Sequence, residues 1–169
     1  DGLFIYLCRV LPGTEMAEEK YRVEHGLQTT FLPIQANHGS LAAATIGPTE
    51  FEETVVATKT MPHADWLACQ RIAWFVEVFF VLGIARLPIL SLRHGDSRVP
   101  ATHFAEWALE AVAQHPKVFP LVSREVDRLT RFLATQELGR PEVDYAGLEA
   151  FPAIRWPAAE ASWLVLMSA

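Results

Sequence analysis

The sequence has few of the residues that hold metal clusters or bind nucleic acid. It contains only two cysteines, Cys8 and Cys69, too few for a disulfide framework or a cluster with three cysteine ligands. Both lie in apolar stretches, so we expect buried, inert thiols in a reducing cytoplasm. No run of Lys and Arg occurs and the formal net charge is −6. This charge argues against a nucleic-acid partner, because phosphate contacts need clustered cations.

Motifs of well-known catalytic sites are also missing. The six histidines form no pair at i,i+4, and no HExxH motif, nucleophile elbow, Walker loop or dinucleotide fingerprint occurs. The first residues do not have the pattern of a signal peptide. The sequence therefore predicts no metal site and no catalytic residue in this chain, and a cytoplasmic location.

A long apolar stretch covers residues 72–92, which is enough to cross a bilayer. Glu77 and Arg86 interrupt it, and an ion at a bilayer centre costs about 3 kcal/mol. We therefore expect a buried helix that ends near Ala85, and no membrane partner. Within that helix an unpaired carboxylate is costly, so Glu77 is expected to pair with an arginine.

What the sequence does contain begins with an apolar run at residues 3–11 (LFIYLCRVL), halted by Pro12-Gly13. Such runs without alternation are typical of strands covered on both faces, as in parallel sheets. A parallel strand needs partners, so the run predicts the end of a larger α/β domain, cut before its last strand. Its unsatisfied edge predicts dimers or strand exchange.

Turn and cap residues divide the rest of the chain. Thr14 is placed to cap a helix over residues 15–25, and Gly26 to end it. Prolines and glycines predict a loop over residues 28–50, and ETVVAT at residues 53–58 suggests a short extended piece.

Helical patterns dominate the second half. We expect helices at residues 63–85, 101–114 and 121–138, and a break over 88–100. The last dozen residues fit a helix or a strand, and a helix is preferred. The predicted fold is mainly α with a short N-terminal β element. Its predicted parts are a last strand and helix (1–27), a loop and linker (28–62) and a helical C-terminal domain (63–169).

Three pieces of this sequence, in this order and spacing, resemble a known family. The first is Val10-Leu11-Pro12-Gly13-Thr14-Glu15-Met16, the second is Glu24-His25-Gly26, and the third is residues 53–58 followed by Met61 and Asp65-Trp66. Together with the helix after residue 63 they are similar to the region that follows the last barrel strand of radical S-adenosylmethionine proteins, especially those that bind cobalamin. The match covers roughly residues 2–85.

The resemblance implies a C-terminal fragment of an α/β protein, an incomplete (β/α)6 (partial TIM) barrel, with a helical extension. The implied parent enzyme binds a four-iron four-sulfur cluster and S-adenosylmethionine; whether it uses cobalamin stays open. The family's CxxxCxxC motif is absent here, so the chain would hold none of these cofactors by itself. Its implied partners are the missing N-terminal part and a small-molecule substrate.

In the family, the chain leaves the final strand at the carboxyl end of the barrel, where α/β barrels carry their binding loops. The resemblance thus places two groups of residues at the site. The cofactor-binding group is Arg9, Leu11, Pro12, Gly13 and Thr14. The substrate-binding group, in the long loop, is Gln35, Asn37, His38 and Ser40.

Two functional hypotheses follow. The first is the C-terminal part of a radical S-adenosylmethionine enzyme, inactive alone, that completes the barrel and helps to form the substrate site. The alternative is a helical protein-interaction or scaffold module without catalysis. The sequence leaves the substrate, the reaction and the oligomeric state open.

Overall fold

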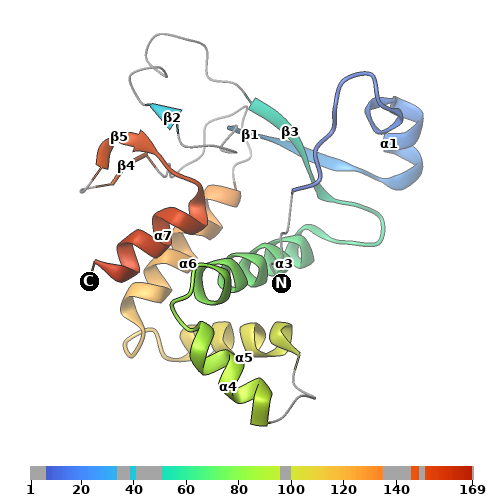
Figure 1. The fold of residues 1–169 in the computed structure, drawn as a ribbon. Helices are drawn as coiled ribbons and strands as arrows, with labels where there is room; N and C mark the ends of the chain where they lie inside the picture. The colour runs from blue at the N-terminus through green and yellow to red at the C-terminus, as the bar shows by residue number, and fades with distance from the viewer. Residues whose placement is uncertain are drawn as a thin grey trace. The chain divides into compact units, whose positions relative to one another are not determined.

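A computed structural model describes residues 7–33, 39–40, 51–95, 100–134, 146–148 and 151–168 (Figure 1). The chain forms two compact units. We call the one formed mainly by Gln70–Leu129 and Pro157–Ala169 the helical unit, and the one formed by Tyr6–Cys69 and Thr130–Trp156 the sheet unit.

The sheet unit is built around an antiparallel pair of strands, β1 (Gln28–Pro33) and β3 (Phe51–Ala57). Their register runs from Gln28 opposite Ala57 to Pro33 opposite Phe51, with one irregularity next to Gln28. Leu32 of β1 is buried, as is β3 from Thr54 to Ala57. The extended piece predicted at residues 53–58 is confirmed. The loop predicted from residue 28 is wrong for β1, where Thr29, Thr30 and Phe31 suit a pleated surface and β3 supplies the backbone partners.

The N-terminal apolar run contacts the other edge of β3. The Val10 N–H donates to the Glu53 carbonyl and the Val55 N–H to the Cys8 carbonyl, both at 2.8 Å. Arg9 thereby forms an antiparallel bridge with Thr54. Within the described residues this segment pairs antiparallel, with β3. The parallel partners predicted for it would belong to another part of the protein, so the parallel pairing stays a prediction. Residues 3–6 of the predicted strand lie outside the described residues.

A turn and two short helices follow. Gly13 has φ +80°, and the Thr14 hydroxyl donates to the Leu11 carbonyl at 2.7 Å. The 3-10 helix η1 (Glu15–Ala17) comes next, then α1 (Glu19–His25) after Glu18, whose backbone is extended. The prediction that Thr14 caps one helix over residues 15–25 is wrong, since its hydroxyl is used inside the turn and the helix is interrupted at Glu18.

The end of α1 is as predicted. Gly26 has φ +58°, and its N–H is bonded to the carbonyls of Arg22 and Val23. The Leu27 N–H then folds back to the Arg22 carbonyl at 2.9 Å. Only glycine adopts this left-handed conformation without a steric penalty, so Gly26 ends the helix.

A second small sheet belongs to the same unit. Its strand order is β2 (Gly39–Ser40), β5 (Phe151–Arg155), β4 (Ala146–Leu148), all antiparallel. The region predicted as a helical C-terminal domain, residues 63–169, thus also contains β4 and β5. These strands are too short to produce a recognisable alternation in sequence.

The longest helical segment starts at α3 (His63–Phe75) and continues as a π-helix, η2 (Val76–Val81). It ends at Leu82, before Gly83 with φ +97°. The helix predicted over residues 63–85 is thus confirmed in position but changes its hydrogen-bond pattern at Val76. The boundary between the two units falls inside α3 and again inside α6 (Pro120–Leu133).

Four further helical segments match the predictions unevenly. The helix at residues 101–114 is confirmed as α5 (Ala101–Gln114), and the terminal helix as α7 (Ala158–Met167). The helix predicted over 121–138 corresponds to α6; residues 135–138 lie outside the described residues. The break predicted over residues 88–100 is wrong, because α4 (Arg86–Gly95) occupies most of it. Pro88 lies in the first turn of α4, where proline costs no intrahelical hydrogen bond.

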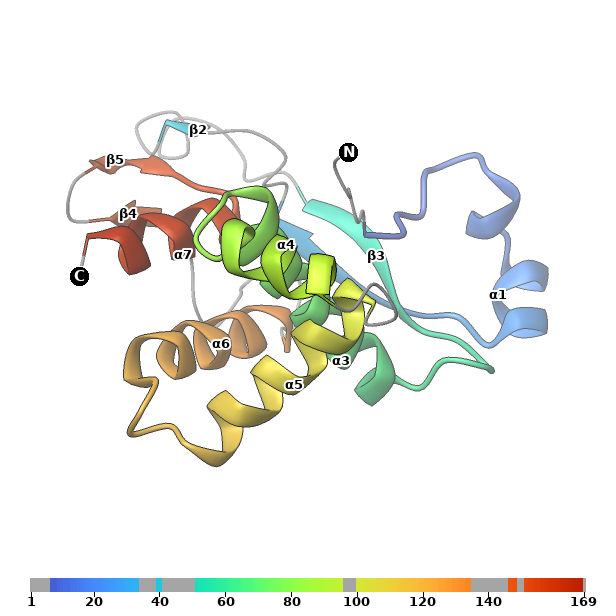
Figure 2. The ribbon, with the colours of Figure 1, turned by 60° about the horizontal axis from the view of Figure 1, so that its bottom comes forward.

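The core of the helical unit surrounds η2, which contacts α4, α5 and α7 (Figures 1 and 2). Val78, Ala105 and Ala161 are fully buried there. The rings of Phe75 and Phe79 stack with centroids 4.4 Å apart. Burial of these apolar side chains is the main source of the unit's stability.

A series of hydrogen-bonded polar side chains crosses this core. The Trp74 Nε1–H donates to Ser162 Oγ at 3.2 Å, and Ser162 Oγ donates to Glu125 Oε2 at 2.9 Å. Glu125 is 2% exposed, and the guanidinium of Arg128 lies 3.8 Å from it. These hydrogen bonds join α3, α6 and α7, and they satisfy polar groups that are buried.

The structure also bears on the predictions for three single residues, Cys8, Cys69 and Glu77. Cys8 and Cys69 are exposed, so the prediction of buried thiols is wrong. Glu77 has a raised pKa, first because of desolvation and then because of the Glu160 carboxylate. The pairing of Glu77 with an arginine stays a prediction.

Within the described residues, no single helix is long and apolar enough to cross a membrane. The segments His63–Val81 and Arg86–Leu92 meet that test only when taken together, and they are bent by 98° at the break between them.

Candidate functional site

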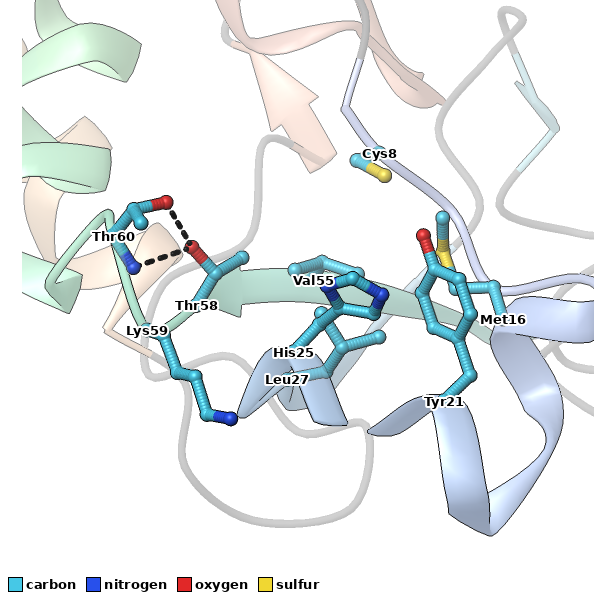
Figure 3. Close-up of a pocket in the computed structure, with 9 residues that line it drawn as sticks. All are labelled: Cys8, Met16, Tyr21, His25, Leu27, Val55, Thr58, Lys59 and Thr60. Atoms are coloured by element: carbon cyan, nitrogen blue, oxygen red, sulfur yellow. Dashed lines mark hydrogen bonds between the residues drawn. The ribbon is translucent and has the colours of Figure 1, made fainter. Parts of the chain in front are cut away.

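A cavity of about 350 Å³ lies in the sheet unit, between the first turns of the chain and β3 (Figure 3). Its apolar lining is Met16, Leu27 and Val55. Its aromatic lining is Tyr21 and His25, and the remaining lining residues are Cys8, Thr58, Lys59 and Thr60. The cavity is thus an apolar surface with polar groups around it, the usual make-up of a small-molecule site.

Helix α1 supplies the two rings. Tyr21 and His25 are one helical turn apart and so lie on the same face. Their ring centroids are 4.2 Å apart with planes inclined at 43°. Figure 3 shows the two rings beside Val55 and Leu27. The rings form one continuous aromatic side of the cavity.

The turn after β3 supplies the polar end. The Thr58 N–H donates to the Met61 carbonyl at 2.9 Å, and Thr58 Oγ1 accepts from the N–H groups of Met61 at 3.1 Å and Thr60 at 3.3 Å. The Thr58 hydroxyl oxygen is therefore engaged in holding the turn. Thr60 Oγ1 lies 3.4 Å from it.

Lys59 ties this turn to the end of α1. Its N–H donates to the His25 carbonyl at 3.0 Å, and its ammonium donates to the Glu24 carbonyl. Its side chain runs so close to Gly26 that a Cβ added there would lie 2.8 Å from Lys59 Cγ. The ammonium also lies at the negative end of the helix dipole, which favours its charge.

An ion pair next to the cavity connects α1 with both strands. Arg22 donates to both carboxylate oxygens of Glu53, at 2.6 and 2.8 Å, and Thr29 Oγ1 donates to Glu53 Oε1 at 2.6 Å. The hydrogen bond from Arg22 has the largest effect on Glu53 and lowers its pKa. Burial raises this pKa by a smaller amount, and the hydrogen bond from Thr29 lowers it further. The bidentate geometry holds α1 against β3.

The residues predicted to bind cofactor lie outside this cavity. Arg9 pairs with Glu52 at 2.8 Å. Burial raises the pKa of Glu52, and Arg9 partly offsets this rise. Residues 11–14 form the exposed turn described above. None of the five is among the residues that line the cavity.

The predicted substrate-binding residues are mostly beyond the described ranges. Gln35, Asn37 and His38 lie outside them, and Ser40 is described only as part of β2, where it pairs with Ile154. Their predicted role stays a prediction.

The residues present do not fit the iron–sulfur cluster that the resemblance implies. The chain has two cysteines, and the cluster of this family takes three from one motif. Among the described residues, no group of three or more His, Cys, Asp or Glu side chains is placed to hold a metal ion. No step of a reaction is therefore assigned to such a group in this chain.

The sequence prediction missed the cavity. Tyr21 and Lys59 are 38 positions apart and carry no motif. The available signal was the αL glycine at position 26, because a backbone that needs glycine often marks a close approach by another segment. That segment proved to be Lys59.

No protein-family model matches this chain, and no curated protein is significantly similar to it in sequence.

Proposed function

We propose that this chain is the C-terminal part of a radical S-adenosylmethionine iron–sulfur enzyme, completing its partial barrel and helping to form its substrate site. By itself it is inactive, because the cluster ligands belong to the missing N-terminal part. The parent is proposed to be a cytoplasmic enzyme that acts on a small molecule, with cobalamin as a further cofactor if the parent carries that domain.

The observation that carries the proposal is that the three pieces of the resemblance meet at one cavity. Met16 comes from the first piece, His25 from the second, and Val55 and Thr58 from the third. Each piece also lies at a junction between elements: the turn before η1, the end of α1, and the end of β3. Segments that are spaced along a sequence and gather at one cavity are typical of binding sites.

In this proposal the exposed turn at residues 11–14 acts only within the complete parent enzyme. Its backbone and the Arg9 side chain, 40% exposed beside Glu52, lie on the surface. In the parent they would face the cofactor bound by the N-terminal part. The second half of the predicted site, Gln35 to Ser40, would contact the substrate.

The reading frame upstream of Asp1 provides the first test. We expect a CxxxCxxC motif within the preceding few hundred residues. A start codon immediately before Asp1 would contradict the proposal.

An activity test on the parent enzyme follows. His38→Ala should lower substrate turnover more than it lowers abortive cleavage of S-adenosylmethionine, because His38 would position the substrate and not the cofactor. His115→Ala is the matched control, since this exposed residue after α5 lies in the other unit. Equal loss of both activities in His38→Ala would indicate a folding or cofactor defect and reject the substrate-binding role.

One observation favours the alternative, a helical protein-interaction module. The helical unit exposes large apolar side chains: Leu87 is 78% exposed, Val118 67% and Trp107 57%. Such side chains mark an interaction site where they form one contiguous patch. The reading frame separates the two proposals, because only the first requires the upstream motif.

A further inference from the structure

Two sulfur-containing side chains and an imidazole line the cavity of the sheet unit, and each comes from a different segment. Cys8 belongs to the segment that pairs with β3, Met16 to η1 and His25 to the last turn of α1. Figure 3 shows the Cys8 thiol, the Met16 sulfur and the His25 ring around one space. Thiolate, thioether and imidazole groups are ligands that copper accepts in proteins.

The pairing of Cys8 with β3 directs its side chain towards α1. The Val55 N–H donates to the Cys8 carbonyl at 2.8 Å, so the two residues lie opposite each other in an antiparallel pair. Opposite residues of such a pair present their side chains on the same face, and both line the cavity. Glu53, two residues before Val55, shares this face and is bonded to Arg22 of α1.

Met16 and His25 approach the same space from the helical side of the cavity. The His25 ring is held next to Tyr21, with ring centroids 4.2 Å apart. The backbone of His25 is fixed as well, because its carbonyl accepts the Lys59 N–H at 3.0 Å. Met16 has a long unbranched side chain with three rotatable bonds, so its sulfur can adjust to an ion that the other two groups hold.

The rest of the lining favours a monovalent ion. Leu27 and Val55 are apolar, and the lining residues that the structure describes include no Asp or Glu. A divalent ion on one thiolate would keep an uncompensated charge in these surroundings, whereas Cu(I) and a thiolate together are neutral. Sulfur ligands also select Cu(I) over harder ions. Lys59 takes no part, because its ammonium is bonded to the Glu24 carbonyl.

We propose that this cavity binds one Cu(I) ion through the Cys8 thiolate, the Met16 thioether and the His25 imidazole. On binding, the thiol of Cys8 loses its proton to solvent and its sulfur bonds to the copper, with no transfer of electrons. The inference rests on the cavity and goes beyond the proposed function, so its test uses the chain by itself.

The first test is an anaerobic titration of the chain, with both cysteines reduced, against Cu(I) held by the coloured competitor bicinchoninate. We expect the chain to remove one Cu(I) from the competitor, measured as loss of the colour of its copper complex. The methyl resonance of Met16 should shift at the same time, and that of Met167, exposed in the other unit, should not. Zn²⁺ should leave the Met16 methyl unmoved, because a thioether is a soft ligand.

Substitutions of the three ligands test the site residue by residue. Cys8→Ser should abolish the removal of Cu(I) from bicinchoninate, because it removes the thiolate. Met16→Leu and His25→Gln should each weaken Cu(I) binding at least about tenfold, since even groups that only orient a metal ligand contribute about 10–100-fold.

The chain offers a control of the same residue type for each ligand. These controls are Cys69→Ser, Met167→Leu and His115→Gln, at positions that do not line the cavity. All three should bind Cu(I) as tightly as the unmodified chain does.

Several results would overturn the site. They are no transfer of copper to the unmodified chain, a Met16 methyl that stays unmoved when copper is bound, and equal weakening by Cys8→Ser and Cys69→Ser. The first two use the unmodified chain, so they decide the matter even if a variant fails to fold. A shift of the Met16 methyl by Zn²⁺ equal to that by Cu(I) would overturn the choice of metal.

Discussion

Glu53 connects three parts of the sheet unit, because its carboxylate accepts from Arg22 of α1 and from Thr29 of β1 while its backbone belongs to β3. Its side chain is 18% exposed and that of Arg22 is 25% exposed. These contacts are therefore only partly screened by water. We expect Glu53→Gln to lower the free energy of unfolding at pH 7 by about 1 kcal/mol, below the usual range for a charged hydrogen bond because of this exposure.

The same contact makes stability depend on pH. Because Arg22 lowers the pKa of Glu53, the contribution is fully present above the ordinary value of 4.5 and is lost as pH falls through the lowered folded-state pKa. When denaturant unfolding is measured from pH 7 to pH 3, the free energies of unfolding of Glu53→Gln and of the unmodified chain should converge at low pH. Glu52→Gln is the control, since burial raises the pKa of Glu52. A difference between Glu53→Gln and the unmodified chain that persists at pH 3 would contradict this account.

Two features require glycine at position 26: its positive φ and the closeness of Lys59. Gly13 has only the positive φ, so it allows the two features to be tested separately. Gly26 and Gly13 both have positive φ, but only Gly26 faces a neighbour, Lys59 Cγ, where a Cβ would be. We expect Gly13→Ala to cost about 1 kcal/mol for the strained backbone and Gly26→Ala to cost more, by thermal or denaturant unfolding. If both cost the same, the close approach of Lys59 contributes nothing.

At the scale of elements, α3, α6 and α7 are joined by the hydrogen-bonded chain from Trp74 through Ser162 to Glu125. Ser162 is fully buried and is the middle member. Ser162→Ala should lower stability by about 1–3 kcal/mol, because it removes the donor to Glu125 and the acceptor of Trp74 together.

Ser168→Ala provides the comparison for this prediction. The Ser168 hydroxyl donates to the Val165 carbonyl at an exposed position after α7, so its loss should cost within about 0.5 kcal/mol. Equal effects of the two substitutions on urea unfolding would mean that the buried chain does not hold the helices together.

At the scale of the whole molecule, the prediction concerns the cysteine ligands that an iron–sulfur cluster would need. Purified anaerobically and reconstituted with iron and sulfide, it should stay colourless, because two cysteines cannot supply three cluster ligands. Absorption spectra and iron analysis measure this outcome. A stable cluster absorbance at one cluster per chain would refute it.

Local signals in the sequence determined the elements that depend on near neighbours. The helix at residues 101–114, the terminal helix, the end of α1 at Gly26 and the extended piece in β3 were all predicted, since periodicity and caps act within a few residues. The mainly helical class followed from the same signals.

Contacts between distant residues decided the rest. β1 exists because β3 pairs with it, and Cys8 to Val10 lie antiparallel because their backbone meets Glu53 and Val55. Likewise the cavity forms because Lys59 is bonded to the end of α1, 34 residues before it in sequence. Hydrogen bonds and packing between distant segments leave no local pattern, so only the tertiary structure shows that Tyr21, His25 and Lys59 line one site.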